Sequence, residues 1–329
     1  MDNPTPEMIN QEMLEFLNYV RAPYKQRKSF LRFDLAEMQS ADNEQFNQKL
    51  GQLLDRVDGL KTNTLILKAV SDSNGDGKID AAYFPNRQLK MQQDMLNRVV
   101  WQSRTRIANR VYAELPISLE TEQNVDLAML TADLVKNNSS IEGLMLDTGS
   151  MLDCAIGQQK WTPNCEAQVN RVFKIKERSK EQAKYYANIS NNYQTALKVN
   201  LEKTQLDGLK PLLDYTLEYA DFLYVELDPI QQPEVFNAFV KQLKTLNEKE
   251  QQYLIASFNV QTPLSTQQVK QLKKSYQQLR SLAIQKVGVN NYSFNLAKVI
   301  HQNFYPELSL NSSPLNYRDP FTQKVLEKK

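Results

Sequence analysis

The sequence predicts an α/β protein built on a single (β/α)8 TIM-type barrel with a short N-terminal helical extension. Segments with strand character alternate along the chain with segments whose apolar residues recur at helical spacing. Eight such strands can be counted, and their sequences do not repeat. No Gly-rich nucleotide-binding loop follows the first strand, which favours a closed barrel over an open doubly wound sheet.

The second unit, residues 61–90, shows the alternation most clearly. Residues 62–70 are β-branched and apolar enough for a strand that is buried on both faces, as in a parallel sheet. Turn-forming residues are concentrated at 71–78. From Asn86 onward the apolar residues follow helical spacing, so the unit is predicted to run from strand through polar loop to helix.

The other elements are predicted in the same way. Residues 1–28 are polar apart from an amphipathic helix at 11–20, and we interpret them as a leading helix or the tail of a preceding domain; the barrel would occupy 29–329. Pro116 ends the third strand, and Ser265 opens the last helix with an N-cap pattern. The strands are predicted at 29–35, 62–70, 110–117, 141–147, 195–203, 222–228, 253–261 and 289–295. The helices are predicted at 43–57, from 86, and at 125–135, 167–192, 209–219, 233–247 and 266–284.

Composition excludes some classes of protein. A chain of 329 residues, 41% of them hydrophobic, can bury a large core. The net charge of +2, without a Lys/Arg block, argues against a nucleic-acid partner. No apolar run approaches the roughly 20 residues that cross a bilayer, and the first residues lack the apolar core of a signal peptide. We therefore expect the chain as given to be soluble, although a precursor's leader could have been removed.

Residues at the predicted strand ends suggest a ligand, because functional groups of such barrels lie at the C-terminal ends of the strands. Carboxylates attract positive charge, and aromatic faces stack on sugar rings, so we expect an acidic, aromatic-lined cleft for a cationic or polyhydroxylated ligand. Alternatively, about half of these residues only point into the barrel wall or cap a helix. The candidate ligand-binding residues are Asp34, Glu114, Asp147, Glu202, Glu226, Asp228, Asn259, Tyr224, Tyr292 and Phe294.

His301 is the only histidine. This argues against a Ser-His-Asp hydrolase and against a metal site that uses two or three histidines. Because His301 is a lone histidine located after the last predicted strand, we interpret it as a surface or packing residue.

Residues 72–80 match the start of a calcium-binding loop. Asp72, Asn74, Asp76 and Asp80 stand at ligand positions, but Tyr83 occupies the twelfth position, where such a loop needs a bidentate Glu. Two interpretations are open: a weak calcium site formed by these four residues, or a turn rich in Asp and Asn at the barrel rim. The missing ligand favours the turn, and no cofactor is expected to be required.

Several motifs within residues 71–118 resemble a known family. They are DG at 76–77, YFPNR at 83–87, WQ at 101–102, RTR at 104–106 and YAELP at 112–116. A similar pattern, SDPDGDG…YFPNR…WQLRTR…VYAWMP, follows the second strand in the C-terminal barrel domain of periplasmic poly-β-1,6-N-acetyl-D-glucosamine N-deacetylases of biofilm export systems. The resemblance is weaker but collinear from about residue 30 to about residue 306.

The resemblance implies a periplasmic location, with outer-membrane association through the full-length protein. It implies three partners: the partly deacetylated polymer, the N-terminal deacetylase domain of the same protein, and an outer-membrane exporter. The family's deacetylase site needs an Asp and two histidines on a metal, so a chain with one histidine is not the deacetylase half.

The resemblance also bears on hydrolysis and on the cysteines. Some barrels of the family resemble glycoside hydrolases, with adjacent carboxylates after the fourth strand and a Glu on the seventh. Here Thr148 and Gly149 occupy the positions of the adjacent carboxylates after the fourth strand, and residues 254–258 of the seventh strand contain no Glu. The residue pattern alone leaves a disulfide between Cys154 and Cys165 and two free thiols equally open. The periplasmic compartment that the resemblance implies predicts the disulfide.

Three functional hypotheses follow. The first is a non-catalytic or residually catalytic barrel that binds partly deacetylated polymer and supports its deacetylation and export. The second is an endo-β-1,6-glycosidase whose carboxylate pair is recruited from Asp147, Glu114, Glu202 or Glu226, with Asp147 and Glu226 as the candidate catalytic residues. The third is a structural domain that only docks the deacetylase half or the exporter.

Overall fold

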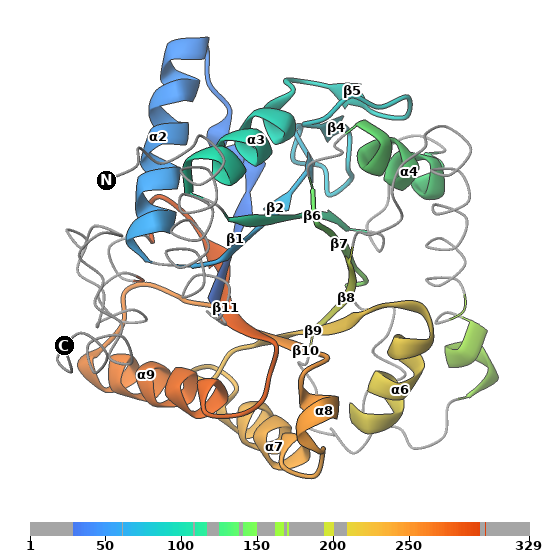
Figure 1. Cartoon of the computed structure of the whole chain (residues 1–329), viewed down its shortest axis with the longest axis vertical. Coiled ribbons are helices and arrows are strands. Elements are labelled where there is room, and N and C mark those ends of the chain that lie inside the picture. Colours follow the sequence, from blue (N-terminus) through green and yellow to red (C-terminus); the bar gives the residue numbers. More distant parts are fainter. Residues whose placement is uncertain are drawn as a thin grey trace, which may run out of the picture.

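The structure is a computed structural model that describes residues 29–60, 62–107, 109–116, 125–137, 141–149, 162–167, 170, 194–200, 209–296 and 300. Its parallel strands form a closed barrel in the order β1-β11-β10-β9-β8-β7-β6-β2. Figure 1 shows this ring of strands surrounded by helices. The predicted (β/α)8 fold is therefore confirmed.

The element bounds follow the predicted units closely. The barrel strands are β1 (Ser29–Asp34), β2 (Thr64–Lys68), β6 (Arg110–Pro116), β7 (Gly143–Asp147), β8 (Gln194–Asn200), β9 (Phe222–Leu227), β10 (Leu254–Phe258) and β11 (Lys286–Tyr292). The helices are η1 (Leu35–Met38), α2 (Asn43–Gly59), α3 (Met95–Ile107), α4 (Leu127–Asn137), α6 (Leu209–Tyr219), α7 (Pro233–Leu243), α8 (Glu248–Gln251) and α9 (Thr266–Arg280). The helices predicted within 1–28 and at 167–192 lie outside or almost wholly outside the described residues.

The loop after β2 differs from the prediction. Instead of starting a helix near Asn86, the chain forms a small sheet of β3 (Val70–Ser71), β4 (Ala81–Ala82) and β5 (Lys90–Met91). The Asn86 side chain accepts hydrogen bonds from the backbone N–H groups of Gln88 and Leu89, which makes a turn, and α3 begins only at Met95. Side-chain capping of this kind competes with helix formation.

The last strand also begins earlier than predicted, at Lys286 rather than at residue 289. Gly288 interrupts the apolar pattern there, but the glycine has a packing role. A Cβ atom at this position would lie 2.2 Å from the Phe30 carbonyl oxygen, so only glycine allows β11 this close an approach to β1. Two helices are shorter than predicted, since α7 ends at Leu243 and α9 at Arg280.

The inside of the barrel changes character along its axis. Near the N-terminal ends of the strands it holds a buried apolar cluster: Phe30, Ile66, Tyr112, Met145, Ala196, Phe222, Tyr224 and Ile255. The rings of Phe30 and Tyr224 lie 5.6 Å apart although β1 and β9 are not neighbours, so they meet across the interior. Because side chains alternate between the two faces of a strand, the next inward positions carry polar residues. These polar positions make the candidate site.

The residues that pack between the barrel and its helices form a second, larger apolar cluster, which includes Leu31, Phe33, Leu65 and Leu67. None of the described helices is both long and apolar enough to cross a membrane.

Candidate functional site

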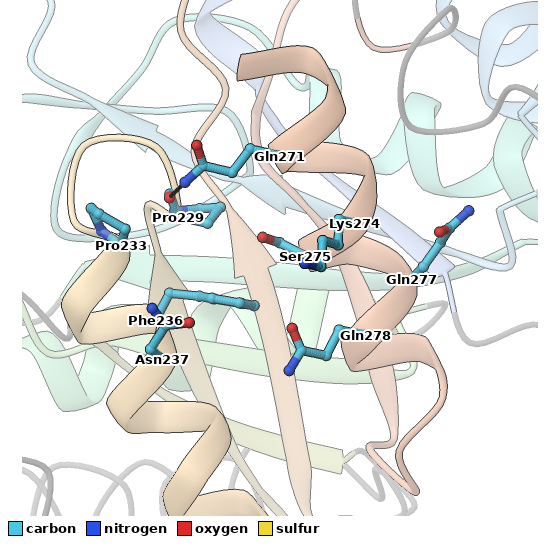
Figure 2. A pocket seen from close by; sticks show the side chains of 9 residues that line it. All are labelled: Pro229, Pro233, Phe236, Asn237, Gln271, Lys274, Ser275, Gln277 and Gln278. Atoms are coloured by element: carbon cyan, nitrogen blue, oxygen red, sulfur yellow. Dashed lines mark hydrogen bonds between the residues drawn. The ribbon is translucent and has the colours of Figure 1, made fainter. Parts of the chain in front are cut away.

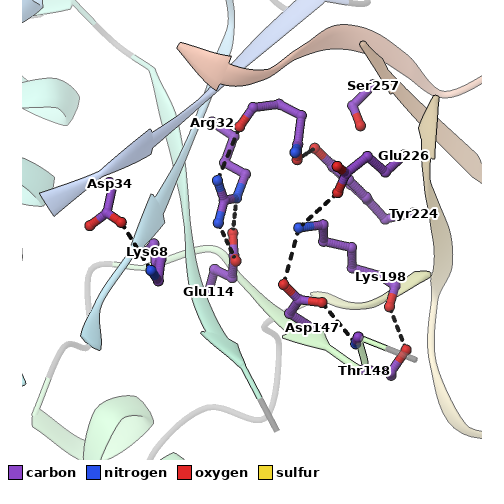
Figure 3. Close-up of polar contacts among 12 residues, drawn as sticks. Arg32, Asp34, Lys68, Glu114, Asp147, Thr148, Lys198, Tyr224, Glu226 and Ser257 are labelled. Carbon is purple, nitrogen blue, oxygen red and sulfur yellow. Dashed lines mark hydrogen bonds and ion pairs between the residues drawn. The ribbon is translucent and has the colours of Figure 1, made fainter. Parts of the chain in front are cut away.

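A network of charged and amide side chains lies at the C-terminal ends of the barrel strands (Figure 3). Its members come from seven different strands or strand ends, which is the usual origin of functional residues in such barrels. We call it the mouth cluster. It comprises Arg32, Glu114, Asp147, Lys198, Glu226, Asn259 and Asn290.

Arg32 and Glu114 form the most buried ion pair of the cluster. The guanidinium binds the carboxylate through two nitrogens, with Nη2 at 2.6 Å from Oε1, and its Nη1 donates to the Asn290 carbonyl oxygen at 3.1 Å. The Glu114 side chain has no exposed area. Burial alone would raise the pKa of Glu114, but the charges of Arg32 and Lys198 outweigh it and hold the pKa below its ordinary value. Glu114 is thus an ionised group committed to Arg32.

Lys198 lies between two carboxylates. Its Nζ is 3.0 Å from Asp147 Oδ2 on β7 and 3.1 Å from Glu226 Oε2 on β9 (Figure 3). Only 7% of the Lys198 side chain is exposed. Burial acts to lower the pKa of Lys198, but Glu114, Asp147 and Glu226 together raise it above its ordinary value, so the ammonium form is stabilised.

Neutral groups hold the two carboxylates in place from other sides. The Asn259 Nδ2 donates to Glu226 Oε1, and the Asn259 Oδ1 in turn accepts from Asn290 Nδ2 at 3.0 Å. The Tyr224 hydroxyl donates to Asn290 Oδ1 at 2.8 Å. On the other carboxylate, the Gly149 N–H donates to Asp147 Oδ1 at 3.0 Å. The position of each carboxylate therefore does not depend on Lys198 alone.

Thr148 and Gly149 occupy the positions of the acidic pair that some barrels of the resembled family carry. Here they make hydrogen bonds at the ends of β7 and β8. Thr148 is buried, and its hydroxyl donates to the Lys198 carbonyl oxygen at 2.7 Å (Figure 3). Gly149 has φ +52°, a conformation that glycine adopts readily. This short turn fixes β7 against β8 and aims Asp147 at Lys198.

Two of the predicted carboxylates bind backbone N–H groups: Asp34 caps the short helix η1, as the alternative interpretation expected, and Asp228 closes the turn before α7. Asp34 accepts from the Ala36 N–H at 2.9 Å and binds Lys68 Nζ at 3.0 Å. Asp228 accepts from the backbone N–H groups of Ile230 and Gln231 at 3.1 and 2.9 Å. Glu202 lies outside the described residues.

The predicted aromatic lining needs correction. Tyr224 and Tyr292 have 0% and 1% of their surface exposed, because Tyr224 packs on Phe30 inside the barrel and Tyr292 packs near Phe33. A ring without an exposed face cannot stack on a sugar in this conformation. Phe294 is only partly buried, with its ring 5.4 Å from that of Phe33.

The predicted acidity of the site also needs correction. Three bases, Arg32, Lys68 and Lys198, each bind carboxylates that the sequence predicts for the site. Strand alternation places Arg32, Lys68 and Lys198 on the same strand faces as Phe30, Ile66 and Ala196, each two residues earlier, but only the structure shows that these faces point into the barrel. The mouth is therefore nearly balanced in charge rather than strongly acidic.

The loop at 72–80 folds onto its own carboxylates. Asp72 accepts from the N–H groups of Gly75 and Gly77 at 2.6 and 2.7 Å, and Asp80 accepts from Ser73. These bonds are typical of the turn rich in Asp and Asn. Among the described residues, no group of three or more His, Cys, Asp or Glu side chains could hold a metal ion. These hydrogen bonds do not test calcium binding, so a weak calcium site at Asp72, Asn74, Asp76 and Asp80 stays a prediction.

The structure describes one of the two cysteines of the predicted disulfide. Cys165 is disulfide-bonded, and no described cysteine is free, which agrees with the predicted disulfide. Its predicted partner Cys154 lies outside the described residues.

A separate groove of about 620 Å³ lies on the outside of the barrel between α7 and α9 (Figure 2). The side chains of Phe236, Asn237, Gln271 and Gln278 line it, and Gln271 Nε2 donates to the Pro229 carbonyl oxygen at 2.6 Å. Lys274 is the charged residue of its lining, and no carboxylate takes part. The groove therefore lacks the groups that the sequence predicts for a cationic ligand.

The distances at Lys198 also limit the hydrolytic chemistry. The Asp147 and Glu226 oxygens that share the Lys198 Nζ can lie no more than about 6 Å apart. Inverting glycosidases separate their carboxyl groups by about 6.5–9.5 Å and retaining enzymes by about 5–5.5 Å. The pair is thus close enough for the retaining type, but the Lys198 ammonium occupies the space between the two oxygens.

Comparisons of sequence connect the first part of the barrel with known proteins. Residues 32–144 match hypothetical glycosyl hydrolase family 13. The poly-beta-1,6-N-acetyl-D-glucosamine N-deacetylase of Escherichia coli strain K12 is 31% identical over 109 residues, which are 33% of this chain and 16% of the deacetylase. The corresponding protein of E. coli O157:H7 gives the same values. The match thus spans a small part of the deacetylase's length.

Comparisons of structure support the fold over most of the chain. The PgaB (BpsB) glycoside hydrolase domain from Bordetella bronchiseptica superimposes with a TM-score of 0.63 at 20% identity, covering 87% of this chain and 100% of that domain. The catalytic domain of chitinase B from Arthrobacter TAD20 gives 0.51 at 8% identity, covering 88% and 97%. At these identities the likeness is one of fold.

Proposed function

We propose that this chain, a PgaB-like barrel of the glycoside hydrolase type, binds partly deacetylated poly-β-1,6-N-acetyl-D-glucosamine at its mouth and supports the polymer's deacetylation and export. The observation that carries the proposal is the carboxylate pair of Asp147 and Glu226. Both side chains are partly exposed, at 20% and 14%, and both are held from behind by neutral donors. The sequence match to a deacetylase of this polymer supplies the class of ligand.

The chemistry of the polymer fits such a pair. Deacetylation exposes amines that are largely protonated near neutral pH, so the polymer carries positive charges along a neutral, polyhydroxylated chain. Asp147 and Glu226 can bind an ammonium, while Asn259 and Lys68 offer donors to hydroxyl or carbonyl oxygens. Each partly exposed ion pair contributes only about 0.2–1 kcal/mol. We therefore expect binding of short oligomers in the millimolar range, rising with oligomer length.

The second candidate function is an endo-β-1,6-glycosidase that uses Asp147 and Glu226. The short separation of the pair favours it. Lys198 opposes it, because a sugar that reacted there would have to displace a buried ammonium bound to both carboxylates. We expect hydrolysis to be slow or absent.

The partners and the compartment are part of the proposal. We place the chain in the periplasm, associated with the outer membrane through the full-length protein, together with a deacetylase domain of that protein and an outer-membrane exporter. A disulfide at Cys165 is compatible with this, since disulfides persist in oxidising compartments.

Calorimetric titration with oligomers of equal length tests the proposal. Partly deacetylated oligomers should bind more tightly than fully acetylated ones, and added salt should weaken binding because exposed charges are screened. Asp147→Asn and Glu226→Gln should each weaken binding of the deacetylated form. Asp214→Asn is a matched control, because Asp214 is an exposed carboxylate on α6 that binds Lys210. Equal affinity for both oligomers would overturn the proposal.

A further inference from the structure

We propose that Lys198 is a tethered competitor for ligand amines. Asp147 and Glu226 form a binding position for a primary ammonium, and the Lys198 ammonium fills it. A ligand amine enters only when the Lys198 side chain leaves. This deepens the proposed function, on which it rests, by naming the residue that limits the preference for deacetylated units. The ligand class of the position is a protonated primary amine, such as that of an amino sugar.

The Lys198 ammonium occupies a position between two carboxylates. Its Nζ lies 3.0 and 3.1 Å from carboxylates on the two strands that flank β8. An ammonium has three N–H donors, and two of them suffice for these contacts. The amine of glucosamine, when protonated, has the same charge and the same donors. The position therefore fits either ammonium, and the two cannot occupy it together.

The position persists without Lys198. Glu226 accepts from Asn259, which Asn290 holds in turn, and Asp147 accepts from the Gly149 N–H. Each carboxylate thus has an anchor outside the lysine. If the lysine charge is removed, the two carboxyl groups stay close together without a cation, and this arrangement favours the uptake of a cation.

The covalent attachment of Lys198 lowers the affinity of this position for a ligand amine. A tethered ammonium competes at a high effective concentration, on the order of millimolar or more, without any need to diffuse to the site. Ligand amines therefore gain less from this position than they would gain without Lys198. Removal of the Lys198 charge should therefore raise the affinity for an amine by about tenfold or more, while leaving acetylated units unaffected.

Small amines test the position directly, without the polymer. Thermal unfolding of Lys198→Ala should shift to higher temperature in n-propylammonium chloride or glucosamine hydrochloride, compared with sodium chloride of equal ionic strength. N-acetylglucosamine, which lacks the ammonium, should produce no shift. The wild-type chain should respond much less, and so should Lys198→Arg, which keeps the charge. Adding Asp147→Asn and Glu226→Gln to Lys198→Ala should abolish the response.

The result that overturns the proposal is a folded Lys198→Ala chain that does not respond to amines, or one whose response survives loss of both carboxylates. If Lys198→Ala does not fold, Lys198→Met keeps the aliphatic volume, and glucosamine binding to it is measured by NMR titration. An unchanged glucosamine affinity in Lys198→Met then contradicts the proposal, whereas a rise supports it. Because the probes are small amines, failure of the wild-type chain to bind polymer is a distinct result that concerns only the proposed function.

Discussion

Lys198 and Lys286 are both buried lysines of barrel strands, but they lie at opposite ends of the barrel and in opposite electrostatic settings. Lys198 is near the C-terminal end of β8 and binds two carboxylates. Lys286 is the first residue of β11, and its Nζ donates to the neutral Asn63 Oδ1 at 3.1 Å. The pKa of Lys198 is raised, whereas burial and the charge of Arg110 lower the pKa of Lys286 to about 8.

The contrast shows what burial does to a charge with and without partners. Burial disfavours the ammonium form in both lysines, and only nearby carboxylates reverse the effect. Glu142 acts in that direction on Lys286, but its effect is smaller than that of burial. At the C-terminal end of the barrel, carboxylates thus outweigh burial and stabilise the buried ammonium, whereas at the N-terminal end they do not. This agrees with the placement of function at the C-terminal face of such barrels.

The largest expected effect comes from breaking the buried pair at the C-terminal end. Glu114→Gln leaves Arg32 buried with its main countercharge removed, so we expect a loss of about 3–5 kcal/mol in the free energy of unfolding. Urea denaturation measures it. Replacing both residues, as Arg32→Met with Glu114→Leu, should cost less than Glu114→Gln alone. A loss below about 1 kcal/mol for Glu114→Gln would show that the ion pair with Arg32 does not determine the stability of the C-terminal end of the barrel.

Lys286 should make stability rise with pH. Its pKa is about 8 in the folded chain against an ordinary value of 10.5, so the unfolded chain binds more protons between these values and folding is favoured as pH increases. The rise should be up to about 3 kcal/mol between pH 8 and about 10. Lys286→Met should flatten this part of the curve and raise stability at neutral pH.

Lys198 should have the opposite effect on the pH dependence of stability. Because its folded pKa is raised, its stabilising effect is fully present below the ordinary lysine pKa of 10.5 and is lost only at higher pH. Urea denaturation as a function of pH, for the wild-type and Lys286→Met chains, checks both directions. Identical profiles for the two chains would contradict the assigned role of Lys286.

The smallest effect should come from Lys68, which lies at the same end as Lys198 but is more exposed. It binds Asp34 at 3.0 Å with 23% of its side chain exposed. Solvent screens such a pair, so Lys68→Met should change the free energy of unfolding by no more than about 1 kcal/mol. If Lys68→Met lost as much free energy of unfolding as Glu114→Gln, exposure would not explain the different contributions of the two ion pairs to stability.

The fold could be predicted from the sequence because periodicity and turn residues are local signals. The alternation of strand and helix patterns predicted the barrel. Two local details were wrong: Asn86 forms a turn where helical spacing predicted a helix, and β11 begins at Lys286 because Gly288 does not end the strand. Asp147, Glu226 and Asn259 could be named as site residues because strand ends converge in a barrel. Their pairing with Lys198 could not, because it depends on which side chains of neighbouring strands face inward at the same level. The burial of Tyr224 and Tyr292 depends on the same non-local packing.

We propose that the mouth cluster binds partly deacetylated polymer through Asp147 and Glu226 without cutting it. The most direct measurement incubates the purified chain with this polymer and determines, in one sample, the amount bound and the polymer length by mass spectrometry. We predict that the polymer is bound, that its length does not change, and that Asp147→Asn with Glu226→Gln reduces the bound amount. Rapid shortening of the polymer that Asp147→Asn abolishes would contradict the claim and establish the glycosidase instead.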